Sequence, residues 1–299
     1  MKKTLFKEIR RNSDKYFLML PFSILFVVFT VIPVISSILL SFTDFNMLQP
    51  VSFSGWSNYL RIFLDDDIFP IAVKNTLVFA VITGPLSYFL CLSLAWMINE
   101  FNKNIRTILT FIFYVPSISG TLFTIWAYIF SGDSNGLFNS ILMRLGINYE
   151  PVLWLSDPRY MLTVIIIVQL WASLGTSFLA FIAGLQGVDR ALYEAGTIDG
   201  IRTRFQELRF ITLPSMGPQL MFAAVMQIGA AFGVSGICVA LAGNPSTDYA
   251  AATIVTHLSD MGTARYEMGY ASAIATILFI TMVLINFGIK HLLKRYTNI

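Results

Sequence analysis

Charged residues are scarce in this chain, and their scarcity decides its class. Asp, Glu, Lys and Arg make up 12% of its 299 residues, whereas soluble domains contain roughly a quarter. Hydrophobic residues make up 56%, and the mean hydropathy is +0.70. This composition excludes an ordinary soluble domain. It favours an all-α membrane protein with several spanning helices.

Residues typical of catalytic and metal sites are also scarce. The chain has two cysteines, Cys91 and Cys238, and two histidines, His257 and His291, and it lacks an HExxH motif. The cysteines fall in different apolar segments, so we expect buried free thiols and no disulfide. No phosphate-binding loop of the form Gly-x-x-x-x-Gly-Lys-Ser/Thr is present. We therefore expect no catalytic residue, no metal site and no cofactor bound by this chain.

Long intervals without charge locate the membrane helices. The six uncharged intervals longer than 20 residues are 16–43, 75–99, 107–132, 160–188, 210–247 and 268–289. A spanning helix needs about 20 apolar residues, and a charge at mid-bilayer costs about 2.5–3.5 kcal/mol. We therefore predict six transmembrane helices, close to residues 17–42, 74–98, 107–130, 160–185, 218–242 and 269–289.

The basic residues predict the orientation. With the N-terminus inside, 15 of the 20 Lys and Arg residues face the cytoplasm, as the positive-inside rule requires. Both termini are then cytoplasmic, with end segments 1–16 and 292–299 and a transmembrane domain over 17–291. The first helix is too long for a signal peptide, and we expect it to stay uncleaved. The net charge of +3 reflects this topology and gives nucleic-acid binding no support.

Two short patterns have a structural interpretation. Asp65, Asp66 and Asp67 form an acidic run that could hold a cation. A solvated face or the start of a short surface helix is favoured, because carboxylates stabilise helix N-termini. Gly229 and Gly233 form a GxxxG motif, which predicts close helix packing, with a helix of a partner subunit as one option.

The segment 186–217 is the long charged stretch away from the termini. Asp189 can cap a short helix around Glu194, and Gly200 can end it. Residues 202–210 predict a second short helix with an apolar face. A structured, charged loop at a membrane surface indicates docking of a soluble partner. A loop that only packs on its own bundle is the alternative.

This loop resembles the signature of the permease subunits of binding-protein-dependent ABC importers, specifically the carbohydrate group. The signature is Glu-Ala-Ala, three residues, Gly, nine residues and Ile-x-Leu-Pro. The matching residues are Glu194, Ala195, Gly200, Ile211, Leu213 and Pro214. The chain departs twice: Gly196 replaces the second alanine, and ten residues separate Gly200 from Ile211.

Other segments resemble landmarks of the same family, so that the resemblance covers nearly the whole chain. They are Leu40-Ser41-Phe42-Thr43-Asp44-Phe45, Gly55-Trp56-Ser57-Asn58-Tyr59, Asn75-Thr76 and Met268-Gly269-Tyr270-Ala271-Ser272-Ala273. They are most similar to the subunit type of the larger maltose-type and multiple-sugar permeases. The resemblance implies a multi-pass protein of the bacterial inner membrane.

The resemblance also implies a machine of several subunits. A second homologous permease pairs with this chain, two ABC ATPases that use ATP and Mg dock on the loops, and an extracellular solute-binding protein delivers a sugar or oligosaccharide. The coupling residues are then Glu194, Ala195, Gly196, Asp199, Gly200, Ile211, Leu213 and Pro214. Glu194 is the expected charged contact, and Gly200 is the expected turn.

The spans offer polar and aromatic side chains for an uncharged solute. The candidates are Gln169, Trp171, Ser173, Thr176 and Gln227. The spacing of Gln169, Ser173 and Thr176 predicts one helix face, and the resemblance implies solute contacts there. The helix-5 asparagines of the maltose-type permease, however, are replaced by Ala230 and Gly233. Hydrogen bonds between membrane helices, worth about 0.6 kcal/mol each, are the alternative role.

Three other functions stay open at this point. One is a permease of the same fold for glycerol-phosphate or a polyamine, although the absence of charge in the predicted spans favours a neutral sugar. Another is a membrane scaffold or signalling protein that uses the loop to bind a partner protein. A membrane enzyme would need buried carboxylates, a histidine cluster or an activated nucleophile, and every Asp and Glu lies outside the predicted spans.

Overall fold

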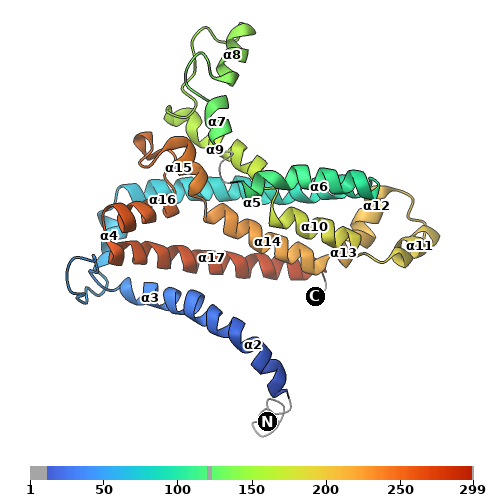
Figure 1. Ribbon diagram of the computed structural model, residues 1–299, viewed down its shortest axis with the longest axis horizontal. Coiled ribbons are helices and arrows are strands. Elements are labelled where there is room, and N and C mark those ends of the chain that lie inside the picture. Colours follow the sequence, from blue (N-terminus) through green and yellow to red (C-terminus); the bar gives the residue numbers. More distant parts are fainter. Residues whose placement is uncertain (1–11, 120–122, 298–299) are drawn as a thin grey trace. The chain divides into compact units, whose positions relative to one another are not determined.

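The computed structural model describes residues 12–119 and 123–297, and these form helices and loops without a strand (Figure 1). An isolated antiparallel bridge joins Thr43 to Phe53. Much of the predicted N-terminal segment and the last two residues lie outside the described residues. The described chain forms two compact units, one containing the residues up to Asp65 and Met261–Ile277, the other the remainder.

The first unit contains the N-terminal span and one end of the last helix. Its elements are α2 (Ser13–Phe26), η1 (Val27–Val31), α3 (Ile32–Leu40), α4 (Ser57–Leu64), most of η5 (Asp260–Ala264) and the start of α17 (Met268–Thr297).

Three of the four landmark segments meet in this first unit. Asn58 Nδ2 donates to the carbonyls of Ser41 and Thr43 at 2.9 and 2.8 Å. The Gly269 N–H donates to the Phe45 carbonyl at 2.8 Å. A Cβ atom at Gly269 would overlap the Thr43 carbonyl oxygen, so this close approach requires glycine.

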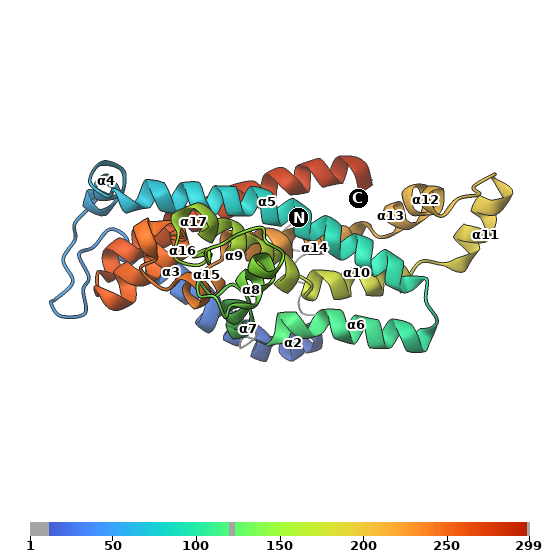
Figure 2. The same cartoon turned by 90° about the horizontal axis from the view of Figure 1, so that it is seen from above.

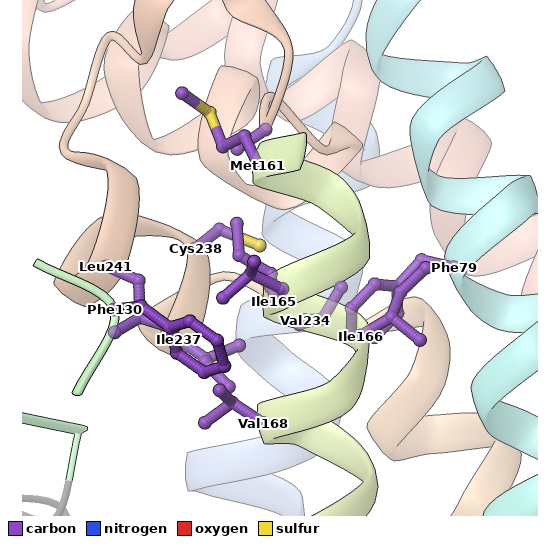
Figure 3. Close-up of a cluster of buried hydrophobic side chains, with 12 residues drawn as sticks. Phe79, Phe130, Met161, Ile165, Ile166, Val168, Val234, Ile237, Cys238 and Leu241 are labelled. Atoms are coloured by element: carbon purple, nitrogen blue, oxygen red, sulfur yellow. The ribbon is translucent and has the colours of Figure 1, made fainter. Parts of the chain in front are cut away.

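The second unit holds the remaining elements. They are α5 (Ile68–Asn99), α6 (Lys103–Ile118), α7 (Phe123–Ile129), α8 (Leu137–Arg144), α9 (Pro158–Ala172), α10 (Thr176–Gln186), α11 (Arg190–Ile198), α12 (Arg204–Glu207), η3 (Leu208–Thr212), α13 (Leu213–Ser215), α14 (Gly217–Phe232), α15 (Gly236–Ala242), η4 (Thr247–Tyr249), α16 (Ile254–Ser259) and the end of α17. One buried hydrophobic cluster joins α5, α9 and α15 around Phe79 and Ile165 (Figure 3). A second joins α5, α10 and α14 around Phe178 and Phe181.

The structure has five or six candidate membrane spans, and five of them agree in position with predicted ones. Five helical segments are long and apolar enough to cross a membrane, namely Asp14–Leu40, Ile68–Asn99, Pro158–Gln186, Gly217–Ala242 and Met268–His291. The pair α6 and α7, bent by 85°, gives a sixth if it counts as one span. The chain is therefore a multi-pass membrane protein.

Two of the spans are interrupted, which the sequence did not predict. The fourth predicted span is divided at residues 173–175 and the fifth at 233–235. Ser173 is the C-cap of α9, whereas Thr176 is the first residue of α10. The prediction that Gln169, Ser173 and Thr176 share one continuous helix face is therefore wrong.

The GxxxG motif lies at the end of α14. Gly229 is in the last turn of that helix, and Gly233 is its C-cap. Apart from its own helix backbone and its chain neighbours, no atom lies within 4 Å of the position that a Cβ would take at Gly229, and at Gly233 the nearby atoms belong to Gly229 itself. Among the described residues neither glycine packs closely against another helix. Packing against a partner subunit stays a prediction.

Asp66 corrects the interpretation of the acidic run. Its Oδ1 accepts hydrogen bonds from the Ile68 and Phe69 N–H groups at 2.9 Å, so it begins the long helix α5 at Ile68 instead of residue 74. Its Oδ2 lies 2.7 Å from Nε2 of His257, and the two side chains are only 6% and 2% exposed. Asp66 therefore lies neither on a solvated face nor at the start of a short surface helix.

The remaining landmark segment, Asn75-Thr76, joins α5 to the segment before α16 by hydrogen bonds. Asn75 Nδ2 donates to three carbonyls of residues 249–252 at 3.0–3.2 Å. Thr76 Oγ1 accepts a hydrogen bond from the Ile254 N–H at 2.9 Å. Thr253 Oγ1 donates to a carbonyl in the interruption of the fifth span at 2.8 Å. These contacts satisfy backbone groups that would otherwise be buried without a partner.

Candidate functional site

The segment 186–217 lies beyond one end of α5, α6 and α10, where α11 and α12 are found together (Figures 1 and 2). Asp189 caps α11, because its Oδ1 accepts a hydrogen bond from the Ala191 N–H at 3.0 Å. The first predicted loop helix is therefore confirmed together with its capping residue.

Gly200 ends α11, as the sequence predicts. Its φ of +90° is left-handed, and nothing lies within 4 Å of the position of a Cβ. The Gly200 N–H donates to the Thr197 carbonyl at 3.3 Å, and the Ile201 N–H donates to the Gly196 carbonyl at 2.9 Å. This pair of bonds is a Schellman motif, in which glycine provides the left-handed residue.

Gly196 stands where the family signature has its second alanine. It is buried, and a Cβ there would lie 2.6 Å from Ile211 Cδ1 and 3.2 Å from Ile201 Cδ1. Ile211, only 8% exposed, therefore occupies the volume that an alanine methyl group would need. The first departure from the signature thus follows from how Ile211 packs.

The second predicted loop helix is α12 followed by the π-helix η3. Thr203 caps α12 in a capping box with Gln206: Thr203 Oγ1 accepts from the Gln206 N–H at 3.2 Å, and Gln206 Oε1 accepts from the Thr203 N–H at 3.1 Å. In η3 the Leu213 N–H bonds to the Leu208 carbonyl, five residues earlier.

The π turn explains how the loop accommodates its second departure from the signature. A π turn closes its hydrogen bond over one residue more than an α turn does. The loop has one residue more than the signature between Gly200 and Ile211, and η3 lies within this stretch and contains Ile211. We infer that η3 absorbs this residue.

Two polar contacts hold the loop in place. The Tyr193 hydroxyl lies 2.9 Å from Thr212 Oγ1, which joins α11 to η3. Arg204 forms ion pairs with Glu207 at 2.8 Å and with Glu100, the C-cap of α5, at 3.2 Å. The Glu207 hydrogen bond first, and then the charge of Glu100, raise the pKa of Arg204. This connection could not be predicted, since nothing local in the sequence pairs residue 204 with residue 100.

The predicted coupling residues separate into two sets. Those with exposed side chains or backbone are Glu194, Ala195, Asp199, Gly200 and Pro214, whereas Gly196, Ile211 and Leu213 are buried or half-buried. Three large apolar side chains are exposed beside the first set, namely Ile198 (88%), Phe205 (65%) and Phe210 (61%). In the described part of the chain the Glu194 side chain has no hydrogen bond or ion pair. One side of the loop packs inward, and the other is left open.

The same loop lies inside a stretch that matches a known protein family. Residues 87–298 match the family described as the binding-protein-dependent transport system inner membrane component. The chain belongs to this family. The resemblance stated from the loop signature is therefore confirmed, and the protein is a permease subunit of the inner membrane.

Relatives of the permease match it over almost its full length. The probable ABC transporter permease protein YesP of Bacillus subtilis (strain 168) is 31% identical over 96% of this chain and 92% of its own. The arabinooligosaccharides transport system permease protein AraP of the same organism is 31% identical over 92% and 87%. A chain of a bacterial alginate ABC transporter, crystallised with alginate pentasaccharide-bound periplasmic protein, superposes with a TM-score of 0.79 at 26% identity, over 98% of both chains.

In this permease three of the candidate solute residues differ in exposure. Gln169 and Trp171, both in α9, are half-buried, whereas Thr176 at the start of α10 is exposed. The Trp171 ring packs edge-on against Trp126 of α7, with 5.3 Å between ring centroids. Trp171 therefore has a packing role within the described chain.

The other two candidates are joined through a cysteine. Cys91 Sγ donates to the Ser173 carbonyl, and Gln227 Nε2 donates to Cys91 Sγ, both at 3.5 Å. The contacts connect α5 and α14 to the interruption between α9 and α10. Cys91 and Cys238 are buried free thiols, as predicted.

Proposed function

We propose that this permease forms half of the translocation pathway of an ATP-driven importer for a sugar or oligosaccharide, and that the segment 186–217 couples it to an ATPase. The observation that carries the proposal is the two-sided loop. Its exposed side presents Glu194 and Ile198 to a partner, while Arg204, whose side chain is also exposed, forms an ion pair with Glu100 at the end of α5. A docked ATPase would thus be connected directly to a spanning helix.

The proposed topology follows from the same loop. Arg190, Arg202, Arg204 and Arg209 all belong to it, so the positive-inside rule assigns it to the cytoplasm. With six spans, both termini are cytoplasmic too, and 17–291 is the transmembrane domain. The partners are a second homologous permease, two ABC ATPases that use ATP and Mg²⁺, and an extracellular solute-binding protein.

The proposed solute class rests on the relatives. AraP is named for arabinooligosaccharides, and the superposed alginate transporter was crystallised with a periplasmic protein that holds an alginate pentasaccharide. Both solutes are oligosaccharides, which supports the same class here. Gln169, Trp171, Ser173, Thr176 and Gln227 remain the proposed pathway residues.

The coupling proposal is tested by Glu194→Lys, with retention of the ATPase on the purified permease as the measurement. We expect at least about tenfold less ATPase, because close charge pairs across interfaces are worth about 1.5–7 kcal/mol. Glu150→Lys is the matched control, because Glu150 is also exposed and lies in the predicted outer loop. Normal ATPase retention and normal solute uptake in Glu194→Lys would refute the proposal.

The solute class is tested with the binding protein that copurifies with the permease. Calorimetric titration with neutral oligosaccharides, glycerol-phosphate and polyamines separates the three candidate classes. We expect heat only with oligosaccharides. Binding of glycerol-phosphate or a polyamine instead would keep the importer and replace its solute.

A further inference from the structure

A groove between α6 and α10 has no part in the proposed function. The two helices lie side by side in the second unit (Figures 1 and 2), and between them is a cavity of about 360 Å³. Its lining includes Lys103, Arg106, Phe111 and Tyr114 from α6, and Leu179 and Ile182 from α10.

The groove is cationic at one end and largely apolar along its length. Lys103 and Arg106 lie in the first turn of α6, and Gln186, the last residue of α10, lines the same end. Tyr114 lies eleven residues after Lys103, which is about 16 Å along a helix. The cationic end therefore adjoins the segment 186–217, and the apolar part extends into the span.

The cations at this end are not neutralised by carboxylates. In the described part of the chain Lys103 has no ion pair, and Arg106 Nη1 donates at 3.2 Å to Asn99 Oδ1, which is a neutral amide oxygen. A neighbouring cavity of about 470 Å³ shares Arg106 with the groove and adds Arg190, which also has no ion pair there.

The two acids of that neighbouring cavity are already engaged. Glu100 and Glu207 both pair with Arg204, at 3.2 and 2.8 Å. The two cavities are lined by four cations, Lys103, Arg106, Arg190 and Arg204, and by only these two carboxylates, so positive charge remains in excess beside the groove.

The position of these cations favours binding of an anion. The N-terminus of a helix carries partial positive charge, so Lys103 and Arg106 in the first turn of α6 stand where the helix dipole opposes them. The positive-inside rule explains the side of the membrane on which they lie. The rule does not explain why Lys103 and Arg106 both line the groove. Thr110 and Tyr114 line it as well, at the spacing of residues on one helix face.

We propose that this groove binds an anionic phospholipid. Its phosphate pairs with Lys103 and Arg106, and an acyl chain lies along Phe111, Leu179 and Ile182. Basic pockets between membrane helices on the cytoplasmic side hold anionic headgroups in this way. Because Gln186 is also the first residue of the segment 186–217, the bound lipid touches the base of the proposed coupling loop.

The test uses the full chain, purified with its copurifying subunits, in nanodiscs of equal parts phosphatidylglycerol and phosphatidylcholine. Lipid that stays bound after re-extraction is quantified by mass spectrometry. We expect phosphatidylglycerol to be enriched, and Lys103→Gln and Arg106→Gln each to lower it about fivefold, the value of one basic residue near an anionic headgroup. Lys290→Gln, an exposed lysine of α17 outside the groove lining, is expected to change nothing.

A second pair of variants blocks the groove without changing charge. Thr110→Trp fills the groove, whereas Ile108→Trp places the same ring on a position of α6 that is 60% exposed and outside the groove. We expect phosphatidylglycerol to be lost only from Thr110→Trp. Absence of enrichment on the unaltered protein overturns the proposal, and so does equal retention by the two tryptophan variants. Neither readout depends on uptake, so the importer proposal is tested separately.

Discussion

Two glycines of the segment 186–217 are required for different physical reasons. At position 196 glycine is required because the side chain of Ile211 fills the space that a methyl group would need. At position 200 the surroundings are empty, and glycine is required because the backbone is left-handed, with a φ of +90°. A larger residue at 196 therefore clashes with a side chain that can move. A larger residue at 200 strains the backbone, and no movement of a neighbouring residue can relieve that strain.

Gly200→Ala tests the backbone requirement. A left-handed alanine costs about 1–2 kcal/mol, so we expect the end of α11 to fray, with faster amide hydrogen exchange there and less ATPase retained. Gly146→Ala is the matched control, because Gly146 also has a positive φ, of +68°, in open space. It lies in the predicted outer loop, and its variant should retain the ATPase fully. Equal ATPase retention by the two variants would contradict the assigned role.

At the scale of elements, the π-helix η3 accounts for the one residue that the loop has in addition to the family signature. Removing one residue from a π turn converts it to an α turn. Deletion of Arg209, within η3, would restore the nine-residue spacing, and we expect ATPase retention to stay within about twofold of the unaltered chain. Deletion of Gly200 shortens the loop by the same one residue but removes the left-handed residue, and we expect it to abolish retention. Loss of the ATPase on deletion of Arg209 would show that the π turn has a role of its own.

The elements could be predicted wherever the signal is local. Gaps between charges locate the spans, and the residue types of Asp189 and Gly200 locate the two ends of α11. The interruptions of the fourth and fifth spans contain no proline, and the glycine in each, Gly175 and Gly233, is a weak signal because glycine is frequent inside membrane helices. The Val234 carbonyl freed there accepts a hydrogen bond from the distant Thr253, and the Ser173 carbonyl accepts one from the distant Cys91 as well as one from the nearby Gly175 N–H.

The same limit applies to polar partners distant in sequence. Asp66 looks like part of a solvated run, yet it is buried against His257, 191 residues later. Arg204 looks like one more basic residue of the loop, yet it reaches Glu100. A pattern of residue types shows which side chains can pair, and only the fold shows which do.

At the scale of the whole molecule, the topology can be tested through the cysteines. Cys91 and Cys238 are buried, so they should not react with a membrane-impermeant maleimide. Tyr149, 91% exposed, and Phe101, 48% exposed and outside the segment 186–217, are suitable reporters. We expect Tyr149→Cys to be labelled on intact cells and Phe101→Cys only after permeabilisation. The opposite pattern would invert the proposed orientation.

The two interrupted spans have a mechanical consequence. α9 and α15 belong to the hydrophobic cluster around Phe79, and α10 and α14 to the cluster around Phe178, while α5 runs without interruption through both. Densely packed cores resist deformation, so we expect each cluster to move as a block. The two interruptions then act as hinges between the blocks, and α5, which belongs to both, bends between them at Pro85, where a helix hydrogen bond is missing. Such a permease would open and close by bending at these fixed positions, with neither core repacked during the cycle.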